Sequence, residues 1–213
     1  MPPSNMAVRF AETITAMPIV AILRGVNPDE VIAVAQAIYD AGVRIIEVPL
    51  NSPNPLVSIA KLSAYFENRA IIGAGTVLTV ENVAQCKAAG AQIIVSPNMN
   101  PFVIQATVSA GMISAPGCFT PTEAFVAIDS GAHAVKLFPG ELISAAAVKA
   151  MRAVLPQDAI VLVVGGVSAA SINSYRDAGA NGFGIGGGIY QAGSSPEESG
   201  AKAAAFVAAL SSC

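Results

Sequence analysis

Short apolar runs and longer amphipathic segments alternate along the chain. Runs that are apolar throughout, without a polar residue at every second position, are typical of parallel strands buried on both faces. Eight such runs recur at intervals of roughly 20–27 residues, the length of one strand–helix unit. The predicted strands are residues 19–23, 43–48, 70–74, 92–95, 112–115, 132–138, 159–164 and 182–185.

The segments between these runs predict helices. Four of them cover residues 28–41, 53–66, 80–89 and 101–110, and residues before Pro18 predict an extra N-terminal helix that covers the bottom of the fold. Glycines that precede four of the strands fit the C-termini of helices; they are Gly42, Gly90, Gly111 and Gly179. The turn at 193–196 introduces a last Ala-rich helix.

Eight strand–helix repeats in one chain of 213 residues predict an α/β fold, a (β/α)8 TIM barrel with an extra N-terminal helix. The alternative is an open, doubly wound parallel sheet. No linker or low-complexity segment divides the chain, so one domain is expected to span residues 1–213.

Composition narrows the class of protein. The chain is 54% hydrophobic and 12% charged, with a net charge of −3, and no basic patch is visible, which excludes nucleic acid as a partner. Its apolar runs fall short of the about 20 residues that a membrane span needs, and residues 1–6 lack the apolar core of a signal peptide. The spacing of Cys86, Cys118 and Cys213 fits neither a metal site nor a disulfide framework, so a reducing cytoplasm is expected.

Lys136 lies inside the apolar run at 134–139 and is the first candidate for chemistry. At the reference pKa of about 10.4, only about one lysine in 10³ is neutral at pH 7. Burial disfavours the ammonium and lowers the pKa of the side chain. The resulting free amine can attack a carbonyl and form a Schiff base.

Glu47 lies in a similar apolar run, in the second predicted strand. Lys136 belongs to the sixth, and alternate strands of a barrel supply the same layer of interior side chains. The two residues are therefore expected to face one another inside the barrel, with Val135 and Leu137 facing the helices. The alternative is a buried Lys–Glu ion pair without chemistry, although such pairs are poor stabilisers.

Two glycine clusters follow the last two strands: Gly165 and Gly166 after the seventh, and Gly186, Gly187 and Gly188 after the eighth. Glycines let backbone N–H groups approach an anion closely, and phosphate sites of such barrels frequently lie after these strands. A phosphate site is therefore predicted, with simple tight turning as the alternative.

Other polar residues near strand ends receive individual interpretations. Arg24, at the end of the first strand, is the candidate carboxylate ligand, with a surface salt bridge as the alternative. Thr76 either binds a carboxylate or caps the helix that begins at Val80. His133 lies at the wrong end of its strand for catalysis and is interpreted as a structural residue. Cys118 is interpreted as a packing residue. Charges at helix starts account for Glu123 and Glu141.

These motifs together resemble the 2-keto-3-deoxy-6-phosphogluconate/galactonate aldolases, a family of class I aldolases built on a (β/α)8 barrel. The resemblance covers the chain from about Pro18 to the last helix, and it rests on segments 20–25, 73–77, 116–118, 135–139 and 165–167 together with Glu47. Residues 48–53, Val-Pro-Leu-Asn-Ser-Pro, and Val164 before the first glycine pair resemble the phosphogalactonate branch of this family. Gly187 departs from the serine that relatives commonly have there, so a hydroxyl contact to phosphate is lost.

The resemblance implies a mechanism. Lys136 forms an imine with the keto carbon of a phosphorylated keto acid, and Glu47 shuttles protons, directly or through water. The protonated imine is the electron sink, so neither a metal nor another cofactor is required. The remaining implied contacts bind the substrate: Arg24 and Thr76 for the pyruvate carboxylate, Pro97 and Phe138 for the pocket wall, and Gly165, Gly166, Gly186 and Gly187 for the phosphate.

The products implied by the resemblance are pyruvate and D-glyceraldehyde 3-phosphate, and family members are typically homotrimers. Three alternatives stay open at this point. The first is the same chemistry on the gluconate epimer. The second is a different phosphate-binding barrel enzyme, such as an isomerase or epimerase, which needs no imine-forming lysine. The third is a catalytically silent phosphosugar-binding barrel.

Overall fold

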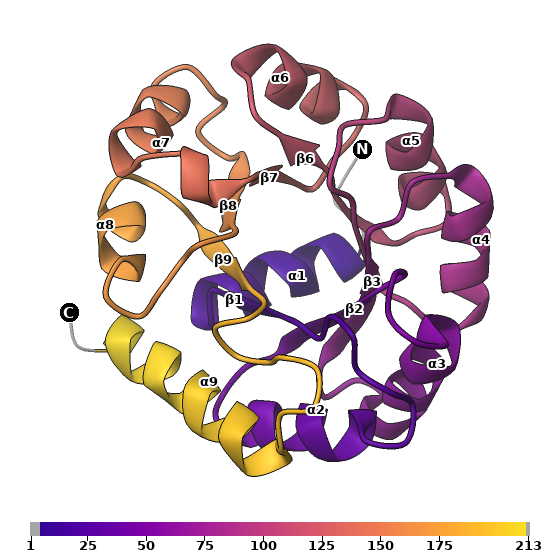
Figure 1. Ribbon diagram of the computed structural model, residues 1–213. Helices are drawn as coiled ribbons and strands as arrows, with labels where there is room; N and C mark the ends of the chain where they lie inside the picture. Colours follow the sequence, from indigo (N-terminus) through magenta and orange to yellow (C-terminus); the bar gives the residue numbers. More distant parts are fainter. Residues whose placement is uncertain (1–4, 212–213) are drawn as a thin grey trace.

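Strands and helices alternate through residues 5–211, the part of the chain that the computed structural model describes, and the strands curl into a parallel barrel (Figure 1). Every predicted strand is confirmed, with the fifth divided in two. The strand segments are β1 (Ile19–Ile22), β2 (Ile45–Pro49), β3 (Ile71–Gly75), β4 (Ile93–Val95), β5 (Ile113–Ala115), β6 (Gly117–Cys118), β7 (Ala134–Leu137), β8 (Ile160–Val164) and β9 (Gly182–Ile185).

Pro116 divides the fifth barrel strand, because proline has no N–H to donate to a sheet. The hydrogen-bonded order runs from β5 through β4, β3, β2, β1, β9, β8 and β7 to β6, so the two ends of the sheet are neighbours in the chain. The Lys136 N–H donates to the Pro116 carbonyl at 2.9 Å and the His133 N–H to the Ser114 carbonyl at 3.0 Å. These bonds close the barrel, so the open-sheet alternative is wrong.

Helices form an outer ring around the strands (Figure 1). Their bounds are α2 (Val31–Asp40), α3 (Pro55–Phe66), α4 (Val80–Ala88), α5 (Pro101–Ser109), α6 (Pro121–Asp129), α7 (Ala145–Arg152), α8 (Ile172–Asp177) and α9 (Pro196–Ser211), with a 3-10 turn η1 (Gly140–Leu142). The four glycines predicted at helix C-termini have φ between 72° and 114°, as the left-handed terminus of a helix requires.

Two helices begin later than predicted, for local reasons. In place of a helix from residue 28, residues 27–30 form a turn in which the Glu30 carboxylate accepts from the Asn27 N–H at 3.0 Å and from the Tyr190 hydroxyl at 2.9 Å. In place of a start at residue 53, Asn54 has a φ of 42° and α3 follows it. At residues 27–30, the side-chain hydrogen bonds of Glu30 compete with the first helical turn.

Two hydrophobic layers separate along each strand. Inward-facing side chains fill the barrel, among them Val20, Ile45, Ile71 and Ile93, while their sequence neighbours, such as Ile46, pack under the helices. This alternation is the normal consequence of strand geometry in a barrel. It places large aliphatic side chains at the N-terminal end of the barrel interior.

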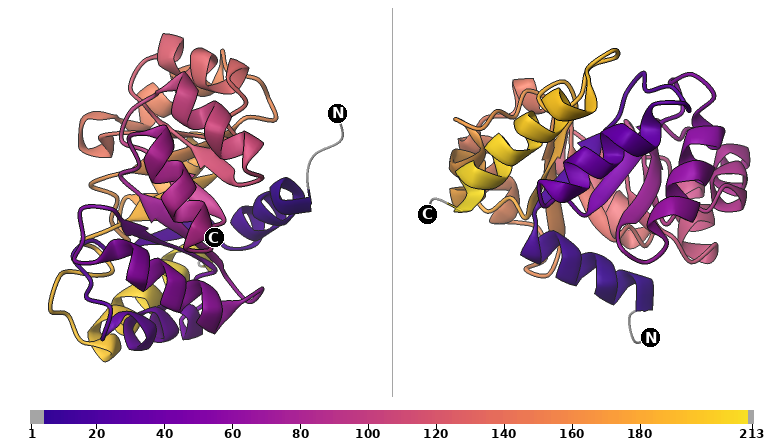
Figure 2. Two further views of the ribbon diagram at one scale, coloured as in Figure 1. Left: turned by 90° about the vertical axis from the view of Figure 1, so that its right-hand side faces the viewer. Right: turned by 90° about the horizontal axis from the view of Figure 1, so that it is seen from below.

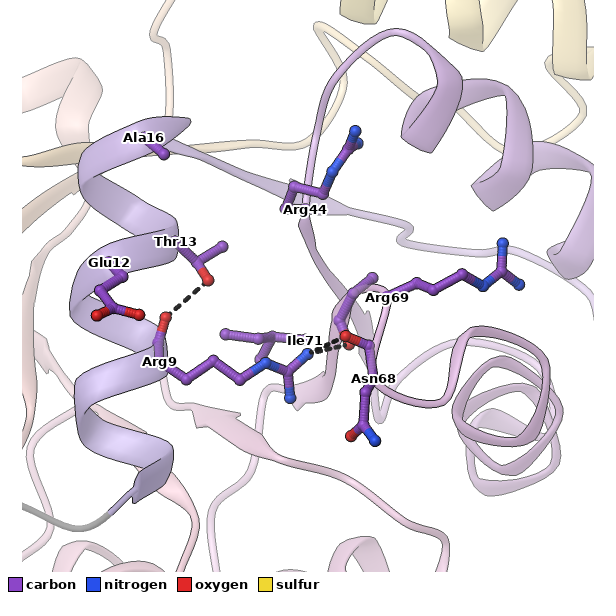
Figure 3. Close-up of a pocket in the computed structure, with 9 residues that line it drawn as sticks. Arg9, Glu12, Thr13, Ala16, Arg44, Asn68, Arg69 and Ile71 are labelled. Atoms are coloured by element: carbon purple, nitrogen blue, oxygen red, sulfur yellow. Dashed lines mark hydrogen bonds between the residues drawn. The ribbon is translucent and has the colours of Figure 1, made fainter.

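Helix α1 (Asn5–Ala16) covers that end of the barrel, as predicted, and lies apart from the ring of helices (Figure 2). Phe10 and Ile14 are each 1% exposed and pack on the inward-facing aliphatic layer. The Arg9 guanidinium fastens the helix to the start of β3 by donating to the Asn68 and Ala70 carbonyls at 3.1 and 3.0 Å (Figure 3). The helix therefore closes the N-terminal end of the barrel and shields its hydrophobic interior from solvent.

No helix within residues 5–211 is both long and apolar enough to cross a bilayer. Two sequence predictions concern residues outside the described range: Cys213, and residues 1–4 of the segment expected to lack a signal-peptide core. Cys86 and Cys118 are free and buried, and burial raises the pKa of each thiol to about 12. Cys118 is thus a packing residue, as expected.

Replacing Phe10 by alanine is expected to lower the free energy of unfolding by about 3–5 kcal/mol, because it removes a buried ring and leaves a cavity at the bottom of the barrel. Urea denaturation followed by circular dichroism measures the loss. Val8→Ala is the matched control, since Val8 lies on the same helix and is 41% exposed. Equal losses for the two variants would show that α1 does not seal the core.

Candidate active site

A cavity of about 410 Å³ opens at the C-terminal ends of the strands. Nine of the ten predicted site residues line it, and they come from six different strands or the loops that follow them. They are Arg24, Glu47, Thr76, Lys136, Phe138, Gly165, Gly166, Gly186 and Gly187. The barrel therefore brings together side chains and glycines that lie far apart in the sequence.

Lys136 points into this cavity from β7, while Val135 and Leu137 pack in the outer hydrophobic layer, as predicted. The side chain is 7% exposed, and its Nζ lies 4.4 Å from the centroid of the Phe138 ring. Burial lowers the pKa of Lys136; Glu47 opposes this effect, and Arg24 adds to it. The environment therefore favours the free amine more than water does.

Glu47 faces the same cavity from β2 and is 2% exposed. Burial raises the pKa of its carboxyl to about 7, although Lys136 and Arg24 both act to lower it. Its Oε2 atom is buried without a hydrogen-bond partner. The carboxyl rests against Gly75, where any Cβ would collide with both of its oxygens. Glu47 thus has a proton affinity suited to exchange near neutral pH.

Lys136 and Glu47 interact electrostatically but form no direct ion pair. Within residues 5–211 an ion pair is found instead on the surface, where Lys61 Nζ lies 3.5 Å from Asp29 Oδ1. The interpretation of Lys136 and Glu47 as a structural ion pair is therefore wrong. An amine and an unpaired carboxyl oxygen instead face a space that a small ligand or water can enter.

Arg24 lies at the mouth of the cavity, and its guanidinium donates to the Asn51 side-chain oxygen at 2.6 Å. It makes no salt bridge, so that alternative is wrong. Thr76 has a φ of 57° and lines the cavity. The cap of α4 is Thr79, whose hydroxyl accepts from the Asn82 N–H at 3.1 Å, so the capping alternative for Thr76 is also wrong.

Both glycine clusters line one side of the cavity. Gly165 and Gly166 have φ values of 103° and 66°, which side chains with a Cβ rarely adopt. At Gly186 and Gly187 an added Cβ would find no atom nearer than 3.8 Å, so the wall is open there. Backbone exposed in this way is the surface that an oxyanion such as phosphate needs.

One predicted residue is not in the cavity. Pro97 does not line it; its carbonyl instead lies where a Cβ of Gly117 would be, so Pro97 shapes the neighbouring loop.

Glu141 is a cavity residue that sequence reasoning missed. It was expected to be a helix-start charge, and it does lie in the first turn of η1, but its side chain lies against Gly165 and Gly166 and lines the cavity. The one available signal was its position five residues after Lys136, in the turn that continues that strand. Glu123, in contrast, is a helix-start charge as expected, and it forms a capping box with Thr120.

The remaining candidates lie away from the mouth. His133, at the start of β7, accepts from the Ser114 N–H through Nδ1 at 3.2 Å, and burial lowers its pKa, so its structural role is confirmed. A second cavity, of about 310 Å³, lies beside α1 and includes three arginines. Figure 3 shows the Arg44 and Arg69 side chains pointing away from Arg9, so these charges do not converge on one ligand.

Comparisons with known proteins show the family of this chain. The family model for KDPG and KHG aldolase matches residues 10–200. The 2-dehydro-3-deoxy-6-phosphogalactonate aldolase of Escherichia coli (strain K12) is 45% identical over 195 residues, which cover 92% of this chain and 95% of the relative. A probable 2-dehydro-3-deoxy-6-phosphogalactonate aldolase of Rhizobium meliloti (strain 1021) is 41% identical over 192 residues, which cover 90% of this chain and 91% of the relative.

A solved structure described as native KDPGal has the same fold. It superposes with a TM-score of 0.91 at 45% identity, and the match covers 92% of this chain and 96% of that one.

Replacing Gly75 by alanine is expected to lower the free energy of unfolding by about 1–3 kcal/mol, because the new Cβ overlaps the buried Glu47 carboxyl. Gly187→Ala is the control in the same cavity, where the nearest atom to an added Cβ is 3.8 Å away; its effect should stay within about 0.5 kcal/mol. Urea denaturation compares them. A cost for Gly75→Ala no larger than the control's would mean that Glu47 does not rest on Gly75.

Proposed function

This chain belongs to the KDPG and KHG aldolase family, and on that basis we propose that it cleaves 2-dehydro-3-deoxy-6-phosphogalactonate reversibly into pyruvate and D-glyceraldehyde 3-phosphate. It is a class I aldolase, an enzyme that works through a Schiff base. The single observation that carries the assignment of residues is the buried Lys136 amine, which faces the unpaired carboxyl of Glu47 across one cavity.

The first half of the proposed reaction forms the imine. Neutral Lys136 attacks the keto carbon C2 of the substrate through Nζ, and Glu47 delivers the proton that lets the C2 oxygen leave as water. Desolvation favours this step, because it lowers the pKa of Lys136 and so shifts the amine toward its nucleophilic form. Loss of water leaves a protonated imine, and that positive charge then withdraws electrons from the neighbouring C3–C4 bond.

Cleavage and release form the second half. Glu47 accepts the proton of the C4 hydroxyl, the C3–C4 bond breaks, and its electron pair moves toward the imine to give an enamine. The aldehyde half leaves as D-glyceraldehyde 3-phosphate. Protonation of the enamine at C3 and hydrolysis of the imine release pyruvate and regenerate Lys136. A carboxyl with a pKa of about 7 is suited to donate and accept protons in alternation.

The rest of the cavity supports binding of the two ends of the substrate. Arg24 and Thr76 are proposed to hold the pyruvate carboxylate, and the Phe138 ring packs against the Lys136 amine. The glycine pairs Gly165–Gly166 and Gly186–Gly187 are proposed to hold the phosphate through backbone N–H groups. Pro97 has no place in this arrangement.

We also propose that residues 1–213 form one aldolase domain and that copies of the chain associate as a homotrimer. Support comes from large apolar side chains exposed on neighbouring helices and loops, including Phe102 at 73%, Phe119 at 49% and Phe125 at 39%. Such exposure is typical of surfaces that a partner covers. Free, buried Cys86 and Cys118 fit the proposed cytoplasmic compartment.

Borohydride reduction in the presence of pyruvate is expected to leave a pyruvyl adduct on Lys136, identified by peptide mass spectrometry. Lys136→Ala should give no adduct, whereas Lys149→Ala, on the outer helix α7, should trap like the wild type. An adduct on another lysine would overturn the assignment.

The trapping rate at subsaturating pyruvate is expected to fall above about pH 7, because the Glu47 carboxyl, whose pKa burial raises to about 7, then loses the proton that it delivers to the departing C2 oxygen. Glu47→Gln should trap about 10²–10⁴-fold more slowly, as loss of a proton shuttle predicts, and without the break near pH 7. A break that persists in this variant would assign it to another group.

Cleavage rates on the two C4 epimers decide the substrate. We expect kcat/KM for 2-dehydro-3-deoxy-6-phosphogalactonate to exceed that for the gluconate epimer by about tenfold or more, a difference of about 1.4 kcal/mol in transition-state binding. Release of pyruvate from each epimer is measured under identical conditions. A reversed preference would assign the gluconate reaction, and turnover of neither epimer would reopen the isomerase and binding-protein alternatives.

A further inference from the structure

The turn after β2 holds Arg24 with a neutral hydrogen-bond acceptor. The guanidinium donates to the Asn51 amide oxygen at 2.6 Å, a short bond for a charged donor. One residue further, the Ser52 hydroxyl accepts from the Gly25 N–H at 3.0 Å. Both residues of the Arg24–Gly25 loop are thus fixed by consecutive residues of a single turn.

That turn is itself anchored. The Leu50 N–H donates to the Gly75 carbonyl at 2.8 Å, and the Ser52 N–H donates to the Pro49 carbonyl at 2.9 Å. Ser52 is 8% exposed, so its hydroxyl bonds where water competes little. Asn51 is exposed at the rim, but its backbone is held between the ends of β2 and β3.

A flexible arginine needs such support. Arg24 is exposed, and a free arginine side chain loses about 2 kcal/mol of rotamer entropy when it is immobilised. A hydrogen bond that already orients the guanidinium removes part of this cost before a ligand binds.

The nature of the acceptor is the second part of the argument. No carboxylate pairs directly with Arg24 in the described part of the chain, and the acceptor that orients it carries no charge. An aspartate at the same place would offer the same geometry but would neutralise the guanidinium. An amide orients the side chain and leaves its full positive charge for a ligand.

We propose that Asn51, supported by Ser52, is a positioning residue that orients the Arg24 guanidinium at the cavity mouth with its charge uncompensated, ready for the carboxylate of the keto acid. This inference rests on the proposed aldolase function and adds a residue that acts through Arg24 rather than on the substrate. Because the carboxylate is bound alike in ground and transition states, the effect belongs in KM rather than in kcat.

Two substitutions separate orientation from charge. Asn51→Ala removes the acceptor, and the pyruvate concentration for half-maximal borohydride trapping on Lys136 should rise about tenfold, the scale of a hydrogen bond to a charged group. Asn51→Asp keeps an acceptor of the same shape but adds a negative charge. It should weaken pyruvate binding at least as much as Asn51→Ala does. The kcat for cleavage at saturating substrate should change less than about twofold for both.

The matched control is Asn54→Asp. It places the same charge change three residues further along the loop, on a side chain that is not the hydrogen-bond acceptor of Arg24, and aspartate tolerates the φ of 42° found there. This variant should bind pyruvate like the wild type. Urea midpoints for all variants confirm that the comparison is between folded proteins.

A double-mutant cycle supplies the decisive readout. In an Arg24→Ala background, Asn51→Ala and Asn51→Asp should have no further effect on half-saturation, because the group that Asn51 positions is absent. A merely structural role would make the effects additive in this background, and it would leave Asn51→Asp close to the wild type. Either result would overturn the proposal.

The outcomes also separate this inference from the function on which it rests. If the wild type traps pyruvate on Lys136 and the Asn51 variants half-saturate at the same concentration, the positioning role fails and the aldolase assignment stands. If the wild type forms no adduct, both the positioning role and the aldolase assignment are wrong. A weakening that is equal for Asn51→Asp and Asn54→Asp would show a general charge effect and overturn the specific role of Asn51.

Discussion

The withdrawal of two charged side chains from water, without allowing them to pair, is the constraint on which the site depends. Lys136 and Glu47 are 7% and 2% exposed, and neither forms an ion pair within the described chain. Desolvation moves the pKa of each group toward its neutral form, down for the amine and up to about 7 for the carboxyl. One cavity thereby contains an amine shifted toward its neutral form and a carboxyl whose pKa suits proton exchange near neutral pH, as the proposed function requires.

Side-chain size along the barrel interior accommodates this constraint. At the N-terminal end the inward positions are large and aliphatic, as at Ile45 and Ile71, and α1 seals them with Phe10. Toward the C-terminal end the inward positions of β3 become glycines, among them Gly75, which leaves room for the Glu47 carboxyl. The packing that stabilises the fold is thus concentrated at one end, so the other end can remain hollow.

Segment β2 and its following turn connect the two halves of the proposed chemistry. Glu47 lies within the strand, and Asn51 and Ser52 hold the Arg24 loop from the turn that begins beyond it. Arg24 in turn acts electrostatically on both Glu47 and Lys136, lowering the pKa of each. The proposed function therefore couples carboxylate binding and proton transfer through a stretch of six residues, Glu47 to Ser52.

The sequence by itself determined the strand–helix repeat, the barrel, the N-terminal helix and the inward orientation of Lys136 and Glu47, because hydrophobic periodicity and strand alternation are local properties of the chain. It did not determine that Pro97 lies outside the cavity, that Glu141 lies against Gly165, or that Asn51 holds Arg24. These contacts depend on where irregular loops from different strands meet across the mouth. Only the closed barrel decides that, since it brings together residues that no periodicity relates.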